Sequence, residues 1–284
     1  MSIDPVLFRR FLLVGLVLSL LLLSSRAYGE GCPKEPVEEE GGTHWCYSAG
    51  KRGNVHLWKP AGYDADDAVT VVYVHGHNIG YDRCVNDGYL DCIWDAHGLP
   101  AQFAQSGLKA LFVAVDGPLN DRQKVKWTSL DALLSSIRRD GGIRPPQKVA
   151  AVVHSAGIFT VMRWLDDDRL VHVAALDALY QDSPKRLARW FHASGAHRLT
   201  LVGAAGVHWR AAALARKLKC EVVATDGTYP RAERCAAAVD PDLDHMEVVT
   251  GTRDIIPRVL ARMAGSPPPK AVKKRPRAKK PRRR

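Results

Sequence analysis

Short apolar runs rich in β-branched residues alternate along this chain with amphipathic segments of helical period. The clearest run, residues 149–153, ends in His-Ser-Ala-Gly and is followed at once by a helical pattern over 158–165. Runs of this kind predict strands buried on both faces of a parallel sheet. Further strands are expected at 54–59, 69–74, 110–115, 171–176, 199–203 and 221–225, with helices at 99–106, 129–138, 184–192 and 208–218. The pattern predicts an α/β fold, a mostly parallel central sheet with helices on both faces.

The junction after residues 149–153 is the first candidate for chemistry. A strand that enters a helix through a tight turn exposes the residue at the apex, and Ser155 occupies that apex. A serine hydroxyl is a weak nucleophile at neutral pH. It needs a histidine base, a carboxylate that orients the base, and donors for the developing oxyanion. We therefore interpret Ser155 as the nucleophile and search the chain for its partners.

The base and the acid are sought where other parallel strands end. His245 follows the last predicted strand and precedes a C-terminal helical pattern, which predicts a place at the carboxyl edge of the sheet beside Ser155. Asp177 directly follows the strand at 171–176 and is the candidate carboxylate. The alternatives are Asp226, Asp244 and Asp254 for the acid and His208 for the base.

Two backbone N–H groups are the candidate oxyanion donors. The strand at 69–74 runs into His-Gly-His-Asn, so the N–H of His77 can face the same point as the N–H of Ala156. Asn78 is the near alternative to His77. His75 itself is interpreted as a structural histidine.

By these residues and their order in the chain, the sequence resembles the α/β-hydrolase superfamily, and within it secreted bacterial esterase-like proteins such as polyhydroxybutyrate-depolymerase-like members. The match runs from about residue 54 to 262 and includes the opening Trp-Lys-Pro-Ala-Gly-Tyr at 58–63. The resemblance implies an eight-stranded sheet, hydrolysis of a small-molecule or polymer ester through an acyl-enzyme, and no cofactor. Amide or peptide substrates remain open. Val153 departs from the Gly-x-Ser-x-Gly pattern of the family, and its β-branched side chain calls for a wider turn.

The N-terminus and the cysteines point to an oxidising compartment. Two arginines precede the apolar stretch 11–23, and small residues follow near position 29, so residues 1–29 read as a cleaved export signal. The alternative is an uncleaved membrane anchor, for which the stretch is short. The six cysteines are expected to pair locally, as Cys32–Cys46, Cys84–Cys92 and Cys220–Cys235. The absence of a C-x-x-C pair leaves a zinc site without support, and no metal is expected.

Composition divides the remainder into three parts. Residues 30–42 are acidic with Pro and Gly and are expected to form a linker, and residues 43–264 are expected to form the α/β-hydrolase domain. Ten of the 41 basic residues lie in 265–284 with no acid, which leaves 31 basic against 30 acidic residues elsewhere. The net charge of +11 therefore belongs to a disordered tail.

The basic tail suggests a partner and a competing function. It would be attracted to an anionic envelope polymer or a membrane surface. It has no aromatic side chain to stack on bases, so nucleic acid is not expected. The alternative to a hydrolase is a non-catalytic α/β-hydrolase-fold protein that binds an envelope polymer through this tail.

Overall fold

The computed structural model describes residues 32–263, apart from residues 34, 67, 78–88, 119–123 and 231–232 and the side chains of 89–92. The expected export signal (1–29), the Cys84–Cys92 pair, Asn78 and the basic tail (265–284) lie outside the described residues. Among the residues that are described, no helix is both long and apolar enough to cross a membrane.

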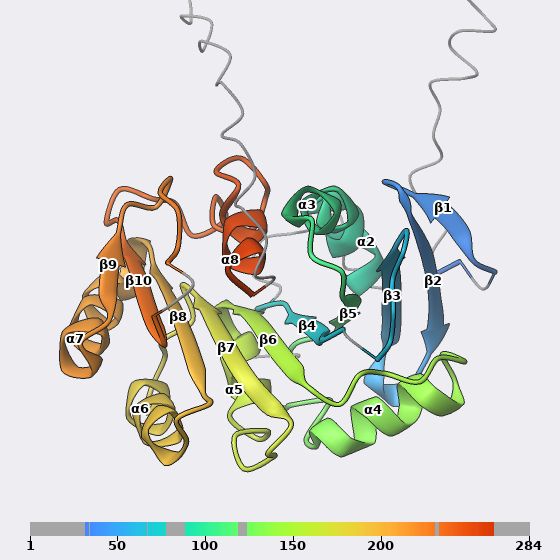
Figure 1. Ribbon diagram of the computed structural model, residues 1–284, viewed down its shortest axis with the longest axis horizontal. Helices are drawn as coiled ribbons and strands as arrows, with labels where there is room; N and C mark the ends of the chain where they lie inside the picture. The colour runs from blue at the N-terminus through green and yellow to red at the C-terminus, as the bar shows by residue number, and fades with distance from the viewer. Residues whose placement is uncertain are drawn as a thin grey trace, which may run out of the picture. The chain divides into compact units, whose positions relative to one another are not determined.

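The strands of the described residues form a single ten-stranded sheet, in the order β1-β2-β3-β5-β4-β6-β7-β8-β10-β9 (Figure 1). The strands are β1 (Val37–Glu39), β2 (Gly42–Ser48), β3 (Asn54–Pro60), β4 (Thr70–Val74), β5 (Leu111–Val115), β6 (Val149–His154), β7 (Leu170–Leu176), β8 (Arg198–Gly203), β9 (Glu221–Val223) and β10 (Cys235–Val239). The first four strands in this order pair antiparallel and all the later pairs are parallel.

The parallel part of the sheet explains why its central strands read as continuous apolar runs. Helices cover both faces, so successive side chains of one strand enter two different cores. In β4, Val72 and Val74 face one core, while Val71 and Tyr73 face the other. This is the α/β arrangement expected from the sequence.

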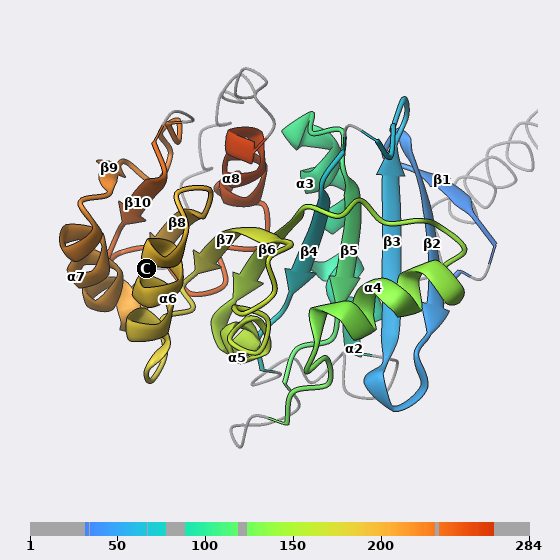
Figure 2. The same cartoon turned by 60° about the horizontal axis from the view of Figure 1, so that its bottom comes forward.

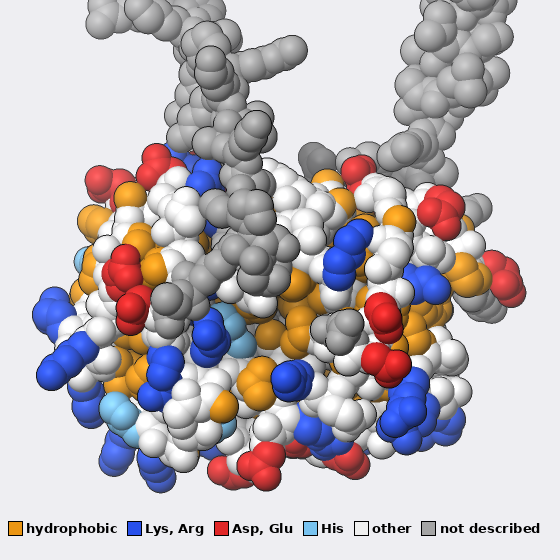
Figure 3. Space-filling view, viewed as in Figure 1, with side chains coloured by type: hydrophobic (Ala, Val, Ile, Leu, Met, Phe, Trp, Pro, Cys, Tyr) orange, Lys and Arg blue, Asp and Glu red, His pale blue; other side chains and the backbone are white. Residues whose placement is uncertain are grey.

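The helices divide between the two faces (Figures 1 and 2). They are α2 (Tyr89–Ala96), α3 (Leu99–Ser106), α4 (Leu130–Arg139), α5 (Ile158–Val161), α6 (Ser183–Ala193), α7 (His208–Leu218) and α8 (Ile255–Met263). Apolar residues of α4 to α7 pack into one core, and those of α2, α3 and α8 pack into the other. The exposed face in Figure 3 carries basic and acidic side chains together, in agreement with a nearly neutral globular part.

Strands β1, β2 and β10 were not predicted, and the sheet has ten strands where the resemblance implied eight. Strand β1 lies within the segment 30–42, which was expected to be a linker. It is held by its pairing with β2 and by contacts of its last residue, Glu39. The Trp58 indole donates to the Glu39 carbonyl at 2.9 Å, and His44 Nδ1 contacts the Glu39 carboxylate at 2.8 Å. Strand β10 was also missed: its alanine-rich sequence lacks the β-branched residues that marked the other strands. The helix expected at 158–165 is short and gives way to turns after Val161.

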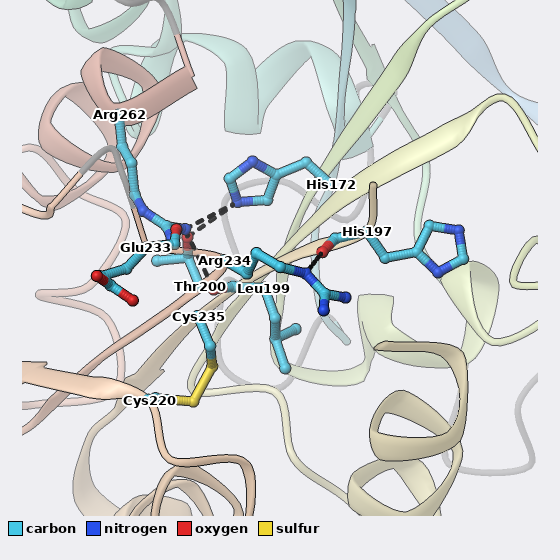
Figure 4. The surroundings of a disulfide bond; sticks show 9 residues. All are labelled: His172, His197, Leu199, Thr200, Cys220, Glu233, Arg234, Cys235 and Arg262. Carbon is cyan, nitrogen blue, oxygen red and sulfur yellow. Dashed lines mark hydrogen bonds between the residues drawn. A yellow bond between two sulfur atoms is a disulfide. The ribbon is translucent and has the colours of Figure 1, made fainter. Parts of the chain in front are cut away.

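Two disulfides, Cys32–Cys46 and Cys220–Cys235, are present as expected. Such bonds are typical of extracellular or periplasmic proteins. The second lies beside an arginine from α8 that ties this helix to the sheet (Figure 4). The buried Arg262 guanidinium donates to Thr200 Oγ1 at 2.6 Å and to the Leu199 carbonyl at 3.1 Å. Burial is the main cause that lowers the Arg262 pKa, to about 10.

Candidate active site

Parallel strands end at one edge of the sheet, and the sequence-predicted site residues follow four of them, β4, β6, β7 and β10. Gly76 and His77 follow β4, Ser155 follows β6, Asp177 follows β7, and His245 lies in the segment after β10. A cavity of about 650 Å³ opens at this edge. It is lined by His75, Gly76, His77, Ile93, His97, His154, Ser155, Ala156, Phe159, Tyr180, Gln181, Arg210, His245 and Met246. Ser155, His245 and both predicted oxyanion residues therefore border the same space.

Ser155 has the backbone of a strained strand-to-helix elbow. Its φ is +51°, a left-handed conformation that costs a non-glycine residue free energy and is found mainly at functional positions. A short 3-10 helix, Ser155–Gly157, begins directly at the end of β6. Since the first N–H groups of a helix have no partner within it, the N–H of Ala156 is positioned as a donor at the cavity. The buried Val153 packs in the core with α5, and the turn forms with this residue in place of glycine.

Two glycines create the room that the elbow needs. A Cβ at Gly76 would lie 2.5 Å from Ser155 Cβ, and one at Gly157 would lie 2.4 Å from the Val74 carbonyl oxygen. Real Cβ atoms do not approach other atoms so closely, so either side chain would force the backbone apart. The close contact between the elbow and the loop after β4 therefore depends on glycine at both positions.

Asp177 and His245 form a hydrogen bond of 2.5 Å between Oδ2 and Nδ1. Asp177 is 1% exposed and has a φ of +43°, and its second oxygen accepts the N–H of Ala204 at 2.9 Å. The carboxylate is thus fixed from two sides, and Nδ1 of His245 carries the proton that it donates. This tautomer leaves Nε2 of His245 able to accept a proton.

His154 holds the segment that carries His245. Its Nε2 lies 3.1 Å from the His245 carbonyl oxygen, and the two rings are 4.4 Å apart between centroids. Complete burial, followed by repulsion from His245, lowers the pKa of His154 well below its usual value. His154 therefore stays neutral at pH 7 and donates to the carbonyl without placing a second positive charge beside His245.

Tyr180 brings a hydroxyl to Ser155. Tyr180 and Ser155 line the same cavity, and the serine side chain influences the Tyr180 phenol. Burial is the main cause that raises the Tyr180 pKa, so the phenol is neutral at pH 7.

Contacts among His75, Asp116 and Lys126 support the loop that carries His77. His75 Nδ1 lies 2.6 Å from the Gly76 carbonyl oxygen, and Nε2 accepts the N–H of Gly117 at 3.0 Å. The same ring contacts Asp116, which also pairs with Lys126. Burial favours protonation of Asp116, but the contacts with His75 and Lys126 outweigh it and lower the pKa of Asp116. His75 is thus a structural residue, as its sequence context suggested.

The alternative acids and base have other environments. Asp226 is exposed, Asp244 accepts the N–H of Met246 at 2.8 Å, and Asp254 directly precedes α8. His208 Nδ1 lies 2.5 Å from the Ala205 carbonyl oxygen at the start of α7. In the described part of the chain, no cluster of three or more His, Cys, Asp or Glu residues is arranged to hold a metal.

Sequence reasoning did not single out Arg210, His97 or the hydroxyl of Tyr180 as site residues. Arg210 lies on α7, whose sequence shows only that it packs on the sheet, and His97 lies in the turn that follows α2. The one available signal for Tyr180 was its position three residues after Asp177, in the loop at the carboxyl edge.

No protein-family model and no curated protein matches this sequence. Among solved structures, an S-formylglutathione hydrolase from Agrobacterium tumefaciens has 10% identity and a TM-score of 0.49, over 81% of this chain and 99% of that one. The feruloyl esterase module from Clostridium thermocellum has 12% identity and a TM-score of 0.48, over 84% and 98%. An alpha-beta serine hydrolase homologue from Coxiella burnetii has 13% identity and a TM-score of 0.47, over 78% and 96%. These likenesses concern the course of the backbone, and identities this low carry no argument about activity.

Proposed function

We propose that this protein is an exported serine hydrolase that cleaves carboxylic esters through an acyl-enzyme on Ser155. The observation that supports this most is the buried Asp177–His245 hydrogen bond at the cavity in which the left-handed Ser155 is exposed. The buried carboxylate, the strained serine backbone and the fixed histidine tautomer border the same cavity. Such strain lowers the stability of the folded protein and is found mainly at functional sites.

The proposed reaction has two displacement steps. Ser155 Oγ attacks the ester carbonyl carbon while Nε2 of His245 takes the hydroxyl proton. The N–H groups of Ala156 and His77 donate to the oxyanion. The tetrahedral intermediate then breaks its bond to the alcohol oxygen, which leaves with the proton from His245. Water, deprotonated by the same nitrogen, attacks the acyl-enzyme and releases the acid and free Ser155.

Asp177 keeps its negative charge throughout and stabilises the imidazolium that forms on His245. The neutral state of His154 matters at this moment, since a charged neighbour would oppose protonation of His245. No step in this sequence calls for a metal or an organic cofactor.

Export is part of the proposal and rests on the N-terminal sequence together with the two disulfides. The anionic envelope polymer or membrane surface proposed as partner of residues 265–284 is a separate matter, since these residues lie outside the described part of the chain. The competing function, polymer binding without catalysis, predicts a folded protein in which Ser155 is unreactive.

A fluorophosphonate probe tests the proposal directly. Wild-type protein should be labelled, and Ser155→Ala should not. Ser135→Ala, an exposed serine on α4, is the matched control and should be labelled like wild type. Asp177→Asn should remain folded and lose about 10³–10⁴-fold in kcat on chromogenic esters, because the histidine loses its orientation and tautomer. Folded wild-type protein that takes no label would support the binding function instead.

A further inference from the structure

One cavity residue has no part in the proposed reaction and carries a permanent charge. Among the described residues that line the cavity, Arg210 is the single arginine or lysine, and none is a carboxylate. The remaining lining consists of histidines and of apolar or neutral polar residues. A half-buried cation beside a nucleophile, without an acidic residue in the same lining, is arranged for an anionic ligand.

Arg210 is held in a fixed position before any ligand arrives. It lies on α7, and its Nη1 donates to the Leu179 carbonyl at 3.1 Å and more weakly to the Gln181 carbonyl at 3.5 Å. Its guanidinium also lies 4.9 Å from the centroid of the Trp209 ring. Both hydrogen bonds use Nη1, so they leave the N–H groups of Nη2 and Nε for a ligand. A guanidinium presents these donors in a planar fork that matches the two oxygens of a carboxylate.

The same loop connects Arg210 to the reacting centre. The two carbonyls that hold Arg210 flank Tyr180, which lines the cavity together with Ser155. A group bound at Arg210 would therefore share the cavity with the nucleophile.

The nearby Asp177 does not neutralise Arg210. It is 1% exposed, and its two oxygens are occupied by His245 and by the N–H of Ala204. Its negative charge is compensated within the site, so the positive charge of Arg210 remains available to the cavity.

We propose that Arg210 binds a carboxylate of the substrate, and that the substrates are esters which carry this second, negatively charged group a short spacer away from the scissile carbonyl. This inference rests on the proposed function of Ser155. A cavity of about 650 Å³ accommodates a ligand of this size.

The experiment compares two chromogenic esters of similar size, 4-nitrophenyl hydrogen succinate and neutral 4-nitrophenyl valerate, with the non-enzymatic rate of each subtracted because the succinate carboxylate accelerates its own hydrolysis. Wild type should favour the succinate in kcat/KM by about tenfold, and added salt should reduce this preference because the pair is partly exposed. Arg210→Gln should abolish the preference, and Arg210→Lys should keep part of it. Arg216→Gln, an exposed arginine on the same helix, removes the same charge away from the cavity and should keep the preference. A wild-type ratio near one, or an equal loss in Arg216→Gln, would overturn the inference.

Calorimetry with monomethyl succinate separates this inference from the proposed function. The Ser155→Ala protein should bind this ligand, and Ser155→Ala combined with Arg210→Gln should bind it about tenfold more weakly. Failure of both chromogenic esters with wild type would refute the hydrolase, yet the calorimetry would still test Arg210. Equal binding by the two proteins would refute the carboxylate site even if both esters are cleaved. Circular dichroism melting of each variant checks that it is folded.

Discussion

Because Gly76 packs closely against Ser155, the effect of Gly76→Ala on activity and stability can be calculated from the structure. In Gly76→Ala the new Cβ would lie 2.5 Å from Ser155 Cβ, 3.0 Å from Ser155 Oγ and 3.3 Å from the His154 carbonyl oxygen. Non-bonded carbons approach to about 3.5 Å, so the loop after β4 and the elbow must separate by about 1 Å. The crowded atom is Ser155 Cβ, which is bonded to the backbone and cannot move away by side-chain rotation.

A displacement of about 1 Å between reacting groups costs about 10²-fold in rate. Overpacking of this kind costs about 1–3 kcal/mol of stability. We therefore expect Gly76→Ala to fold, with a kcat/KM on 4-nitrophenyl butyrate and a fluorophosphonate labelling rate both lowered by about 10²-fold. Urea unfolding measures the accompanying loss of stability.

Gly195→Ala is the control for this experiment. A Cβ at Gly195 meets no atom within 4 Å, so activity and stability should equal those of wild type. If Gly76→Ala instead keeps wild-type activity and stability, the loop and the elbow do not pack as described. The argument that places His77 beside Ser155 would then fail as well.

Three further predictions concern other parts of the structure. Replacing Cys220 and Cys235 together with serine should lower the free energy of unfolding by about 3 kcal/mol, measured by urea titration, because the bridge closes a loop with a sequence separation of 15 residues. Burial, with repulsion from His75, lowers the His97 pKa to about 4, so the unfolded chain takes up this proton near pH 6.5 and the folded protein does not. Stability should therefore fall by about 3 kcal/mol between pH 6.5 and pH 4, and His97→Asn should show a shallower fall in urea titrations across this range. Tyr180→Phe should lower kcat/KM about tenfold with an unchanged melting temperature, since it removes a hydroxyl from the cavity that Ser155 lines and keeps the ring that packs against the core; equal rates would exclude a role for that hydroxyl.

The sequence predicted the centre of the fold better than its margins. Central strands such as β4 and β6 are buried on both faces, and strands buried in this way have continuous apolar sequences that can be recognised. Strand β1 (Val37–Glu39) has no apolar run, because its residues are exposed or half-buried and it is held by pairing with β2. Strand β10 is buried, yet three of its five residues are alanine, which lacks the β-branched side chain that marks the other strands.

For the candidate site, the chain order predicted which residues come together but not how they are held. Ser155, Asp177 and His245 could be identified because parallel strands end at one edge, a rule that depends on topology alone. The supports of these residues, His154 below His245 and Ala204 beside Asp177, depend on side-chain directions that a linear pattern does not contain. Arg210 shows the same limit, since the helical period assigns it to α7 and leaves open whether it faces solvent or the cavity.

The valine at position 153 bears on how relatives of this protein can be found. The turn forms with valine two residues before Ser155, while a side chain at Gly76 or Gly157 would clash with the neighbouring backbone or with Ser155. A text search for the five-residue signature would pass over this chain and any other with valine at that position. A search for a left-handed serine between a buried strand and a helix would retrieve them.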